Sequence, residues 1–349
     1  MTWANKAAFI LICSVMAFTT VAYGGVHQPI LAIFYIAVAA LLVLWAVDGA
    51  KTGVLKYSPN LVQLPIILTA LYGFVQVIPF GSFQTAGLTD VPSKISLDPF
   101  ATQVNSLHFA ALFIFLAVLL TVLDSAGRIR RFAAAIGIFG TAFAFFGILQ
   151  SVLSPDKIYG IYEAKAAPPF GSFINRHNFA AFMEMSLAVP LGMLFAGVVA
   201  RDKRLLFITA AGLMGISLIM SGSRGGLVAL AAEVIFIVIV TMRSRRQGVF
   251  IKAGLATLML AAIIAGSFVI GGESSLTRLA DTTRSADVTT DRSHIWNATL
   301  KMIAGNMPFG VGLGAYGVAY TQYDDRSGLE RVEQAHNDYL QVLSDAGIV

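Results

Sequence analysis

The chain has 349 residues, of which 57% are hydrophobic and 12% are charged, and it carries a formal net charge of +5. Soluble globular proteins carry about 25% charged residues, so this composition excludes a soluble globular protein. Long apolar stretches recur near the ~20 residues that a helix needs to cross a bilayer, whereas a spanning barrel would show short alternating segments. The composition therefore predicts an all-α, polytopic membrane protein, and the single cysteine, Cys13, excludes an intramolecular disulfide.

Nine apolar segments follow one another along the chain, and we expect each to form a membrane-spanning helix. They cover residues 7–23, 29–47, 61–79, 104–123, 132–153, 178–199, 205–220, 225–242 and 249–270. Residues 1–24 could instead be a cleaved signal peptide, since Lys6 precedes the apolar stretch and small residues follow it. The regular alternation of the basic loops favours an uncleaved first span.

Basic residues fall in every second loop, which predicts a cytoplasmic N-terminus. They are Lys6, Lys51, Lys56, Arg128, Arg130, Arg131, Arg201, Lys203, Arg204, Arg243, Arg245 and Arg246. The loop 154–177, with three basic residues, is an exception. This topology signal accounts for most of the net charge, so the charge does not indicate a nucleic-acid partner. The loops 80–103, 154–177, 221–224 and 271–340 are then expected on the far side of the membrane.

The first candidate stretch on that far side is PPFGSFINRHNFAAF, residues 168–182. Asn175 or Asn178 is a plausible N-cap for the span that follows. Arg176 and His177 would then lie at the start of that helix. Glu184 follows His177 by seven residues, which places both on the same helix face.

The second candidate stretch is LIMSGSRGGLVAL, residues 218–230, in which Arg224 stands between two apolar segments. Residues 221–223 are expected to break one helix, and the next would start near Gly225. A helix start offers free N–H groups and a positive dipole end, so an arginine there predicts an anion site, most often for phosphate. Arg176 or Arg224 alone could instead reach toward lipid headgroups. Two arginines at two helix starts on one face favour a polyanionic ligand, such as a lipid diphosphate.

The third candidate region is the long loop, which contains a helix-like stretch bearing Arg292 and His294 and closed by Gly305 and Pro308. Further along, apolar residues around His336 recur at helical spacing, at Leu329, Val332, Tyr339, Leu340 and Leu343. This pattern predicts a helix with His336 in its packed stripe. His336 is then either a core histidine with a satisfied hydrogen bond or a group that moves a proton near neutral pH.

Two other patterns carry no site in our interpretation. Residues Gly312–Gly317 match G-x-G-x-x-G, but a dinucleotide site needs a preceding strand, so we expect a flexible turn. The pairs Asp291 with His294 and His336 with Asp338 lack a diagnostic metal-ligand spacing. We therefore predict neither a metal nor another cofactor.

Glu184 and Glu233 are ionisable residues inside expected spans, where such residues are costly and often functional. Either could pair with one of the arginines. They also support an alternative function, a transporter or flippase for a lipid-linked saccharide. Such a protein would typically show internal repeats, and the sequence shows none.

Over roughly residues 130–347, the chain resembles the O-antigen ligase/polymerase (Wzy-C) superfamily. The motifs that carry the resemblance are GSFINRHNFAAFMEMSLAVPLGMLFAG, SGSRGGLVAL, DRSHIWNATLKMIAGNMPFGVGLGAY and AHNDYLQVLSDAG. His336 and Gly347, with ten residues between them, have the spacing of the histidine and glycine in that family's large periplasmic loop. One departure stands at Trp296, where the Arg-x-x-x-Leu motif often described for ligases has leucine.

The resemblance implies a metal-independent, inverting glycosyltransferase with a GT-C-like helix bundle, acting on the periplasmic face. Its donor would be a glycan on undecaprenyl diphosphate, and its acceptor a hydroxyl of lipid A core, of a growing glycan or of a protein. The residues implied in catalysis are His336, Arg224 and Arg292. The residues expected at the donor diphosphate are Arg176, Arg224 and Ser223, with possible support from His177, Asn178, Glu184 and Asn337.

These expectations divide the chain in two. Residues 1–131 would form N-terminal transmembrane helices, and residues 132–349 an O-antigen ligase-like domain that includes the periplasmic loop 271–340. Because another apolar stretch begins just before Val349, we also expect a chain truncated at its C-terminus.

Overall fold

The computed structural model describes residues 2–85, 87–164, 168–242, 292–326 and 332–348. These residues are mostly helical, as the composition predicts. They group into two compact units, the first from Met1–Leu55 and Val122–Leu276 and the second from Lys56–Thr121 and Thr277–Val349. The expected span 249–270, the loop up to Asp291, and Leu329 lie outside the described residues.

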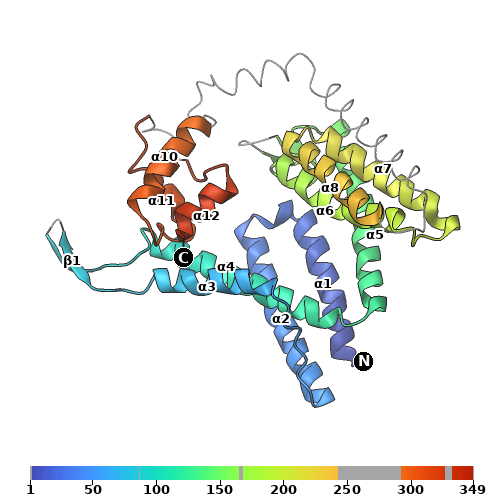
Figure 1. Ribbon diagram of the computed structural model, residues 1–349, viewed down its shortest axis with the longest axis horizontal. Coiled ribbons are helices and arrows are strands. Elements are labelled where there is room, and N and C mark those ends of the chain that lie inside the picture. The colour runs from blue at the N-terminus through green and yellow to red at the C-terminus, as the bar shows by residue number, and fades with distance from the viewer. Residues whose placement is uncertain (1, 86, 165–167, 243–291, 327–331, 349) are drawn as a thin grey trace. The chain divides into compact units, whose positions relative to one another are not determined.

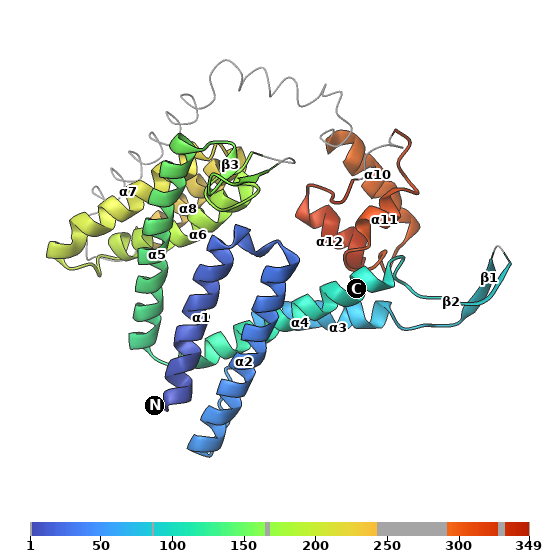
Figure 2. The same ribbon diagram turned by 180° about the vertical axis from the view of Figure 1, so that it is seen from behind.

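Unit 1 is an assembly of apolar helices (Figures 1 and 2). Its elements are α1 (Trp3–Val21), η1 (Tyr23–Gly25), α2 (Gln28–Thr52), α5 (Ala126–Leu153), the two-stranded β3 (Lys157–Ile158) and β4 (Tyr162–Glu163), α6 (Arg176–Phe195), η2 (Arg201–Lys203), α7 (Arg204–Met220) and α8 (Arg224–Met242). In both views α1 and α2 lie side by side, while α6, α7 and α8 form one group with α5.

Unit 2 combines two helices from the first half of the chain with the C-terminal segment. Its elements are α3 (Gln63–Gln76), the antiparallel strands β1 (Ser82–Thr85) and β2 (Leu88–Pro92), α4 (Pro99–Val122), α10 (Arg292–Gly305), α11 (Tyr316–Tyr320) and α12 (Asp338–Ala346). In Figure 1 the three C-terminal helices, coloured orange to red, cluster together.

Among the described residues, six helices are long and apolar enough to cross a membrane: α1, α2, α4, α5, α6 and the stretch Arg201–Met220. They confirm a polytopic, all-α membrane protein. The helix expected over 61–79 is shorter than predicted, because α3 has 14 residues. At ~1.5 Å per residue such a helix is shorter than the ~30 Å hydrocarbon core of a bilayer.

The core of unit 1 forms around α6. Phe179, Met183, Leu187 and Leu191 recur every four residues on one face of this helix and are almost fully buried. They pack with side chains of α7 and α8, among them Met214, Leu218, Leu230 and Val234. Small residues bring the helix starts close together, as is common between helices in membranes. A Cβ on Gly226 would lie 2.8 Å from the Cβ of Ala180, so glycine is required there for α6 and α8 to approach.

The core of unit 2 forms where α10 meets α11 and the segment after it. Ile295, Ala298 and Met302 share one face of α10, which confirms the helix-like stretch expected there. They pack against the start of α11 and against Val332 and Ala335.

The glycine-rich segment 307–314 between α10 and α11 is closely packed and is not the flexible turn that the sequence suggested. Backbone N–H groups of Val311, Gly312 and Ile348 donate to Ser344, Asp345 and Pro308 carbonyls at 2.9, 3.0 and 3.0 Å, respectively. The segment follows a helix, so the glycine pattern lacks the strand that a dinucleotide site needs.

Gln76, at the end of α3, binds this segment through a fully buried side chain. Its amide nitrogen donates to the carbonyls of Phe309 (3.0 Å) and Asp345 (2.9 Å), and its amide oxygen accepts from the N–H of Leu313 (3.1 Å). One side chain thus joins α3 to two parts of the C-terminal segment.

Replacing Gly347 by alanine should destabilise unit 2. An added Cβ would lie 1.9 Å from the carbonyl oxygen of Pro308, and the backbone has φ 72°. We expect Gly347→Ala to lower the free energy of unfolding by more than about 2 kcal/mol. Gly127→Ala is the control, because a Cβ there meets nothing within 4 Å. Equal denaturant unfolding of both variants and the natural protein would contradict this packing.

Candidate functional site

The start of α6 carries the first group of expected site residues. Asn175 is the N-cap, since its side chain accepts from the N–H of His177 at 2.8 Å. This confirms one of the two predicted caps and leaves Asn178 as an exposed residue in the first turn. Arg176 is the first residue of α6, and its Nε is buried with no hydrogen-bond partner among the described residues.

The junction between α7 and α8 carries the second group. Gly222 has φ 66°, a left-handed conformation that suits glycine, and it separates the two helices as predicted. Ser223 then caps α8, because its hydroxyl accepts from the N–H of Gly226 at 3.2 Å and its carbonyl from that of Leu227 at 3.0 Å. Arg224 is the first residue of α8.

The two helix starts meet through a side-chain hydrogen bond. Nδ1 of His177 lies 2.9 Å from the hydroxyl oxygen of Ser223. Because α6 and α8 both begin here, their positive dipole ends and free N–H groups are close together. The structure thus brings Arg176, His177 and Ser223 to one place in unit 1, with Arg224 next in sequence. Such an arrangement favours binding of an anion.

Glu184 and Glu233 lie further along α6 and α8, respectively. They are close enough to interact electrostatically with each other. Both carboxylate oxygens of Glu233 are buried and have no hydrogen-bond partner among the residues that the structure describes. Among the described side chains, neither glutamate forms an ion pair with an arginine, so the pairing expected from the sequence is not observed.

His336 lies in unit 2, outside any helix. The helix predicted from the apolar spacing is wrong here, because residues 332–337 are not helical and α12 begins at Asp338. The reason is local: the side chain of Asn337 accepts from the N–H groups of Tyr339 (3.1 Å) and Leu340 (3.3 Å) and so caps α12. His336 itself is exposed, and Tyr339 is 89% exposed, so His336 is not a core histidine.

The backbone at His336 has φ 50°, which is uncommon for a residue other than glycine. Two hydrogen bonds hold Ala335, the residue before His336, one at its N–H group and one at its carbonyl group. Nε1 of Trp296 donates to the carbonyl of Ala335 at 3.0 Å, and the side-chain oxygen of Gln341 accepts from the N–H of Ala335 at 2.8 Å. Trp296, which departs from the family motif, therefore holds the loop that carries His336 in place.

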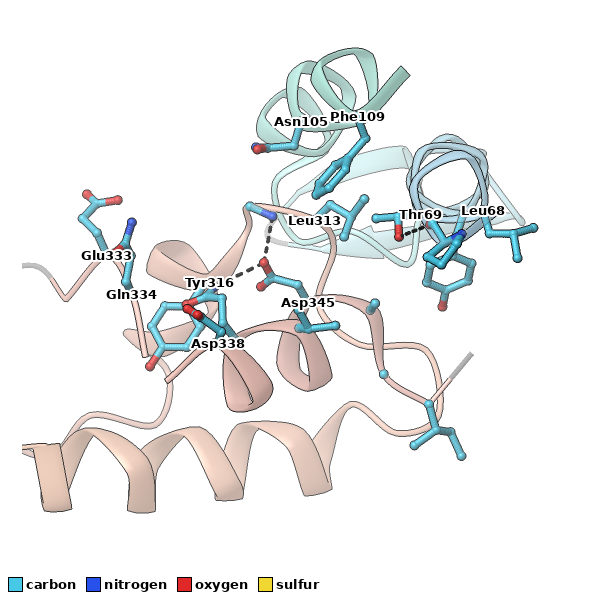
Figure 3. A pocket seen from close by; sticks show the side chains of 18 of the residues that line it. Leu68, Thr69, Asn105, Phe109, Leu313, Tyr316, Glu333, Gln334, Asp338 and Asp345 are labelled. Atoms are coloured by element: carbon cyan, nitrogen blue, oxygen red, sulfur yellow. Dashed lines mark hydrogen bonds between the residues drawn. The ribbon is translucent and has the colours of Figure 1, made fainter. Parts of the chain in front are cut away.

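His336 lines a cavity of about 860 Å³ that lies within unit 2. Side chains from α3, α4 and the C-terminal segment form its walls (Figure 3). The polar and aromatic ones are Thr69, Tyr72, Asn105, Phe109, Tyr316, Glu333, Gln334, His336, Asp338, Gln341 and Asp345.

Arg292, the first residue of α10, is close enough to His336 to affect its ionisation. Although the ring is open to the cavity, the surrounding walls remove part of its hydration. This desolvation and then the positive charge of Arg292 lower the pKa of His336 below its ordinary value of 6.5. The imidazole is therefore neutral at pH 7 and able to accept a proton.

Asp345 is a cavity residue that the sequence analysis did not identify. It is 7% exposed, and its Oδ2 accepts from the N–H of Gly314 (3.1 Å) and from the side chain of Gln341 (3.2 Å). Its Oδ1 is buried with no hydrogen-bond partner among the described residues. Burial raises the pKa of Asp345 to about 6, against the two hydrogen bonds, which lower it. Asp345 follows Gln341 by four residues, the spacing at which side chains on a helix contact each other, and this was the signal in the sequence that could have identified it.

A separate cluster joins α10 to the segment after α11. Nε2 of His294 lies 3.0 Å from Oδ1 of Asp324 and 3.6 Å from Oδ1 of Asp325. By distance these three groups could hold a metal ion, since the ligand atoms lie within 4.8 Å of one another. The sequence analysis had paired His294 with Asp291, which is outside the described residues, and His336 with Asp338, and it predicted a metal at neither pair.

Comparison with known families identifies one match. The O-antigen ligase family model matches residues 209–349. The match includes Ser223, Arg224, Arg292 and His336, and it begins after the start of α6 that carries Arg176 and His177. No curated protein and no solved structure matches the chain.

Replacing Asp345 by asparagine should reduce the pH dependence of stability. Its folded pKa of about 6 exceeds the ordinary 3.8, so the folded protein binds this proton more tightly than the unfolded chain. Its contribution to stability is therefore lost as pH rises from about 4 to 6. Relative to the natural protein, Asp345→Asn should gain about 2 kcal/mol between pH 4 and pH 7.5, measured by denaturant unfolding. Asp90→Asn, at an exposed position, is the control. A constant difference at both pH values would contradict the assignment.

Proposed function

Because residues 209–349 match the O-antigen ligase family model, we propose that the chain transfers a glycan from undecaprenyl diphosphate to an acceptor hydroxyl. The family implies glycan transfer in polysaccharide or lipopolysaccharide biosynthesis. We further propose a GT-C-like, metal-independent enzyme of the bacterial inner membrane, with a cytoplasmic N-terminus and a periplasmic active face. The acceptor would be lipid A core, a growing glycan or a protein side chain.

The donor diphosphate is proposed to bind at the starts of α6 and α8. The adjoining helix starts at His177 and Ser223 support this role, since they provide N–H groups and two positive dipole ends. Arg176 contributes a buried Nε that has no hydrogen-bond partner among the described residues. Arg224, at the first position of α8, would neutralise the negative charge that develops on the leaving diphosphate.

The acceptor is proposed to react at His336. The acceptor oxygen attacks the anomeric carbon and forms the new C–O bond, while the bond to the diphosphate oxygen breaks and its electron pair leaves with the diphosphate. The hydroxyl proton passes to the imidazole of His336. Attack opposite the leaving group inverts the anomeric configuration. Arg292 would contribute positive charge near the reacting centre.

The single observation that carries this proposal is the placement of a neutral histidine at an open cavity. His336 is kept unprotonated at pH 7 by desolvation and Arg292, and its loop is fixed by Trp296 and Gln341. A general base must be unprotonated and held near the reacting hydroxyl, and the lowered pKa of His336 and its hydrogen-bonded loop support this role.

A transporter or flippase for a lipid-linked saccharide is the second candidate function. The buried carboxylate oxygens of Glu233, together with the nearby Glu184, favour it, because ionisable groups inside a membrane often lie on transport paths. Purified protein in liposomes would then move labelled lipid across the bilayer without forming a new glycosidic bond.

A transfer assay with synthetic undecaprenyl diphosphate glycan, several acceptors and EDTA tests the enzymatic function. His336→Ala should lower kcat by about 10²–10⁴-fold and leave the KM for the donor unchanged, because the histidine acts on the acceptor. Arg224→Ala should raise the donor KM, and Arg224→Lys should restore it only in part. Arg201→Ala, an exposed arginine in η2, is the control. Near-normal transfer by His336→Ala would exclude it as the base.

The pH profile of transfer should change when Arg292 is replaced by glutamine. Its positive charge lowers the pKa of His336, so its removal raises that pKa. The fall in rate on the acid side should therefore begin at a higher pH in Arg292→Gln than in the natural protein. Lys301→Gln removes the same charge from an exposed position of α10 and serves as the control. An unchanged acid limb in Arg292→Gln would mean that another group accepts the proton.

A further inference from the structure

We propose that the cavity of unit 2 binds the acceptor as a saccharide without negative charge, and that its carboxyl groups exclude phosphorylated or otherwise anionic sugars. This inference rests on the proposed function, since it takes His336 to be the residue that meets the acceptor hydroxyl.

The charge of the cavity walls is the first observation. Three carboxyl groups line the cavity, those of Glu333, Asp338 and Asp345, and among the described residues no lysine or arginine lines it. Figure 3 shows Glu333 beside Gln334, Asp338 beside Tyr316 and Asp345 near Leu313. An anion that entered would lose hydration and meet like charges, which disfavours its binding.

The polar groups of the walls suit hydroxyl groups. Asn105 and Gln334 contribute amides, which both donate and accept, while the carboxylates accept from sugar hydroxyls. Phe109 projects from α4 beside Asn105 (Figure 3) and offers an apolar ring face to the C–H groups of a sugar. A volume of about 860 Å³ lies within the ~300–1,000 Å³ of pockets for small ligands.

The cavity differs in charge from the helix starts of unit 1. There Arg176 and Arg224 accompany two positive dipole ends, whereas here acidic side chains predominate. A diphosphate therefore has a favourable site in unit 1 and an unfavourable one in the cavity. The charge of each site thus selects between the anionic donor and the neutral acceptor, although both contain sugars.

Binding without a donor tests the inference. The purified full-length chain is titrated with a panel of neutral trisaccharides, each paired with its monophosphate, and saturation-transfer NMR and calorimetry follow the binding. At least one neutral sugar should bind at least about fivefold more tightly than its monophosphate. In Asp338→Asn this preference should shrink severalfold, because one repelling charge is removed. Asp90→Asn, an exposed aspartate outside the cavity, should keep the natural preference.

Equal affinity for a neutral sugar and its monophosphate would overturn the inference, as would the absence of saccharide binding. Glu333→Gln, a second cavity variant, provides the same comparison if Asp338→Asn does not fold. Neutral sugars that bind selectively without transfer would refute the proposed enzyme and retain the charge selection. Equal transfer to neutral and phosphorylated acceptors would support the proposed enzyme and refute the charge selection.

Discussion

The fixed peptide between Ala335 and His336 is the constraint on which the candidate site depends. A histidine at φ 50° is an unfavourable conformation, so other contacts must hold it. Trp296 and Gln341 bind the two polar groups of Ala335, and Asn337 caps the helix that follows. Gln341 in turn contacts Asp345, whose carboxyl accepts from the segment before α11. The position of His336 therefore depends on α10, α12 and the glycine-rich segment together, which makes it a property of the whole unit.

Features with a local cause were predictable from the sequence. The apolar helices follow from composition. The Asn175 cap follows from a hydrogen bond between its side chain and a backbone N–H group two residues further along. The helix expected through His336 was wrong because the apolar spacing was read without the capping ability of Asn337. Residues 332–337 are irregular, and α12 begins at Asp338. Trp296 and Asp345 act through contacts made only in the folded unit, so no periodicity in the sequence reveals their partners.

Charge is distributed in the two units in ways that suit the two substrates we propose. In unit 1, paired helix starts present positive dipole ends near Arg176, at the start of α6, whose buried face belongs to an apolar core. In unit 2, acidic and amide groups surround a cavity beside a neutral histidine. Arg292 already lowers the pKa of His336, so further cations beside the imidazole would make it a still weaker base.

The buried amide of Gln76 also has a consequence for the order of events during synthesis. Its partners are Phe309, Leu313 and Asp345, which lie 233, 237 and 269 residues further along the chain. A ribosome makes these partners long after α3, so for most of translation this side chain has none of them. The cavity walls contributed by α3 and α4 thus precede the C-terminal wall in time. The cavity of unit 2 can therefore form only after residues 309–345 have been made.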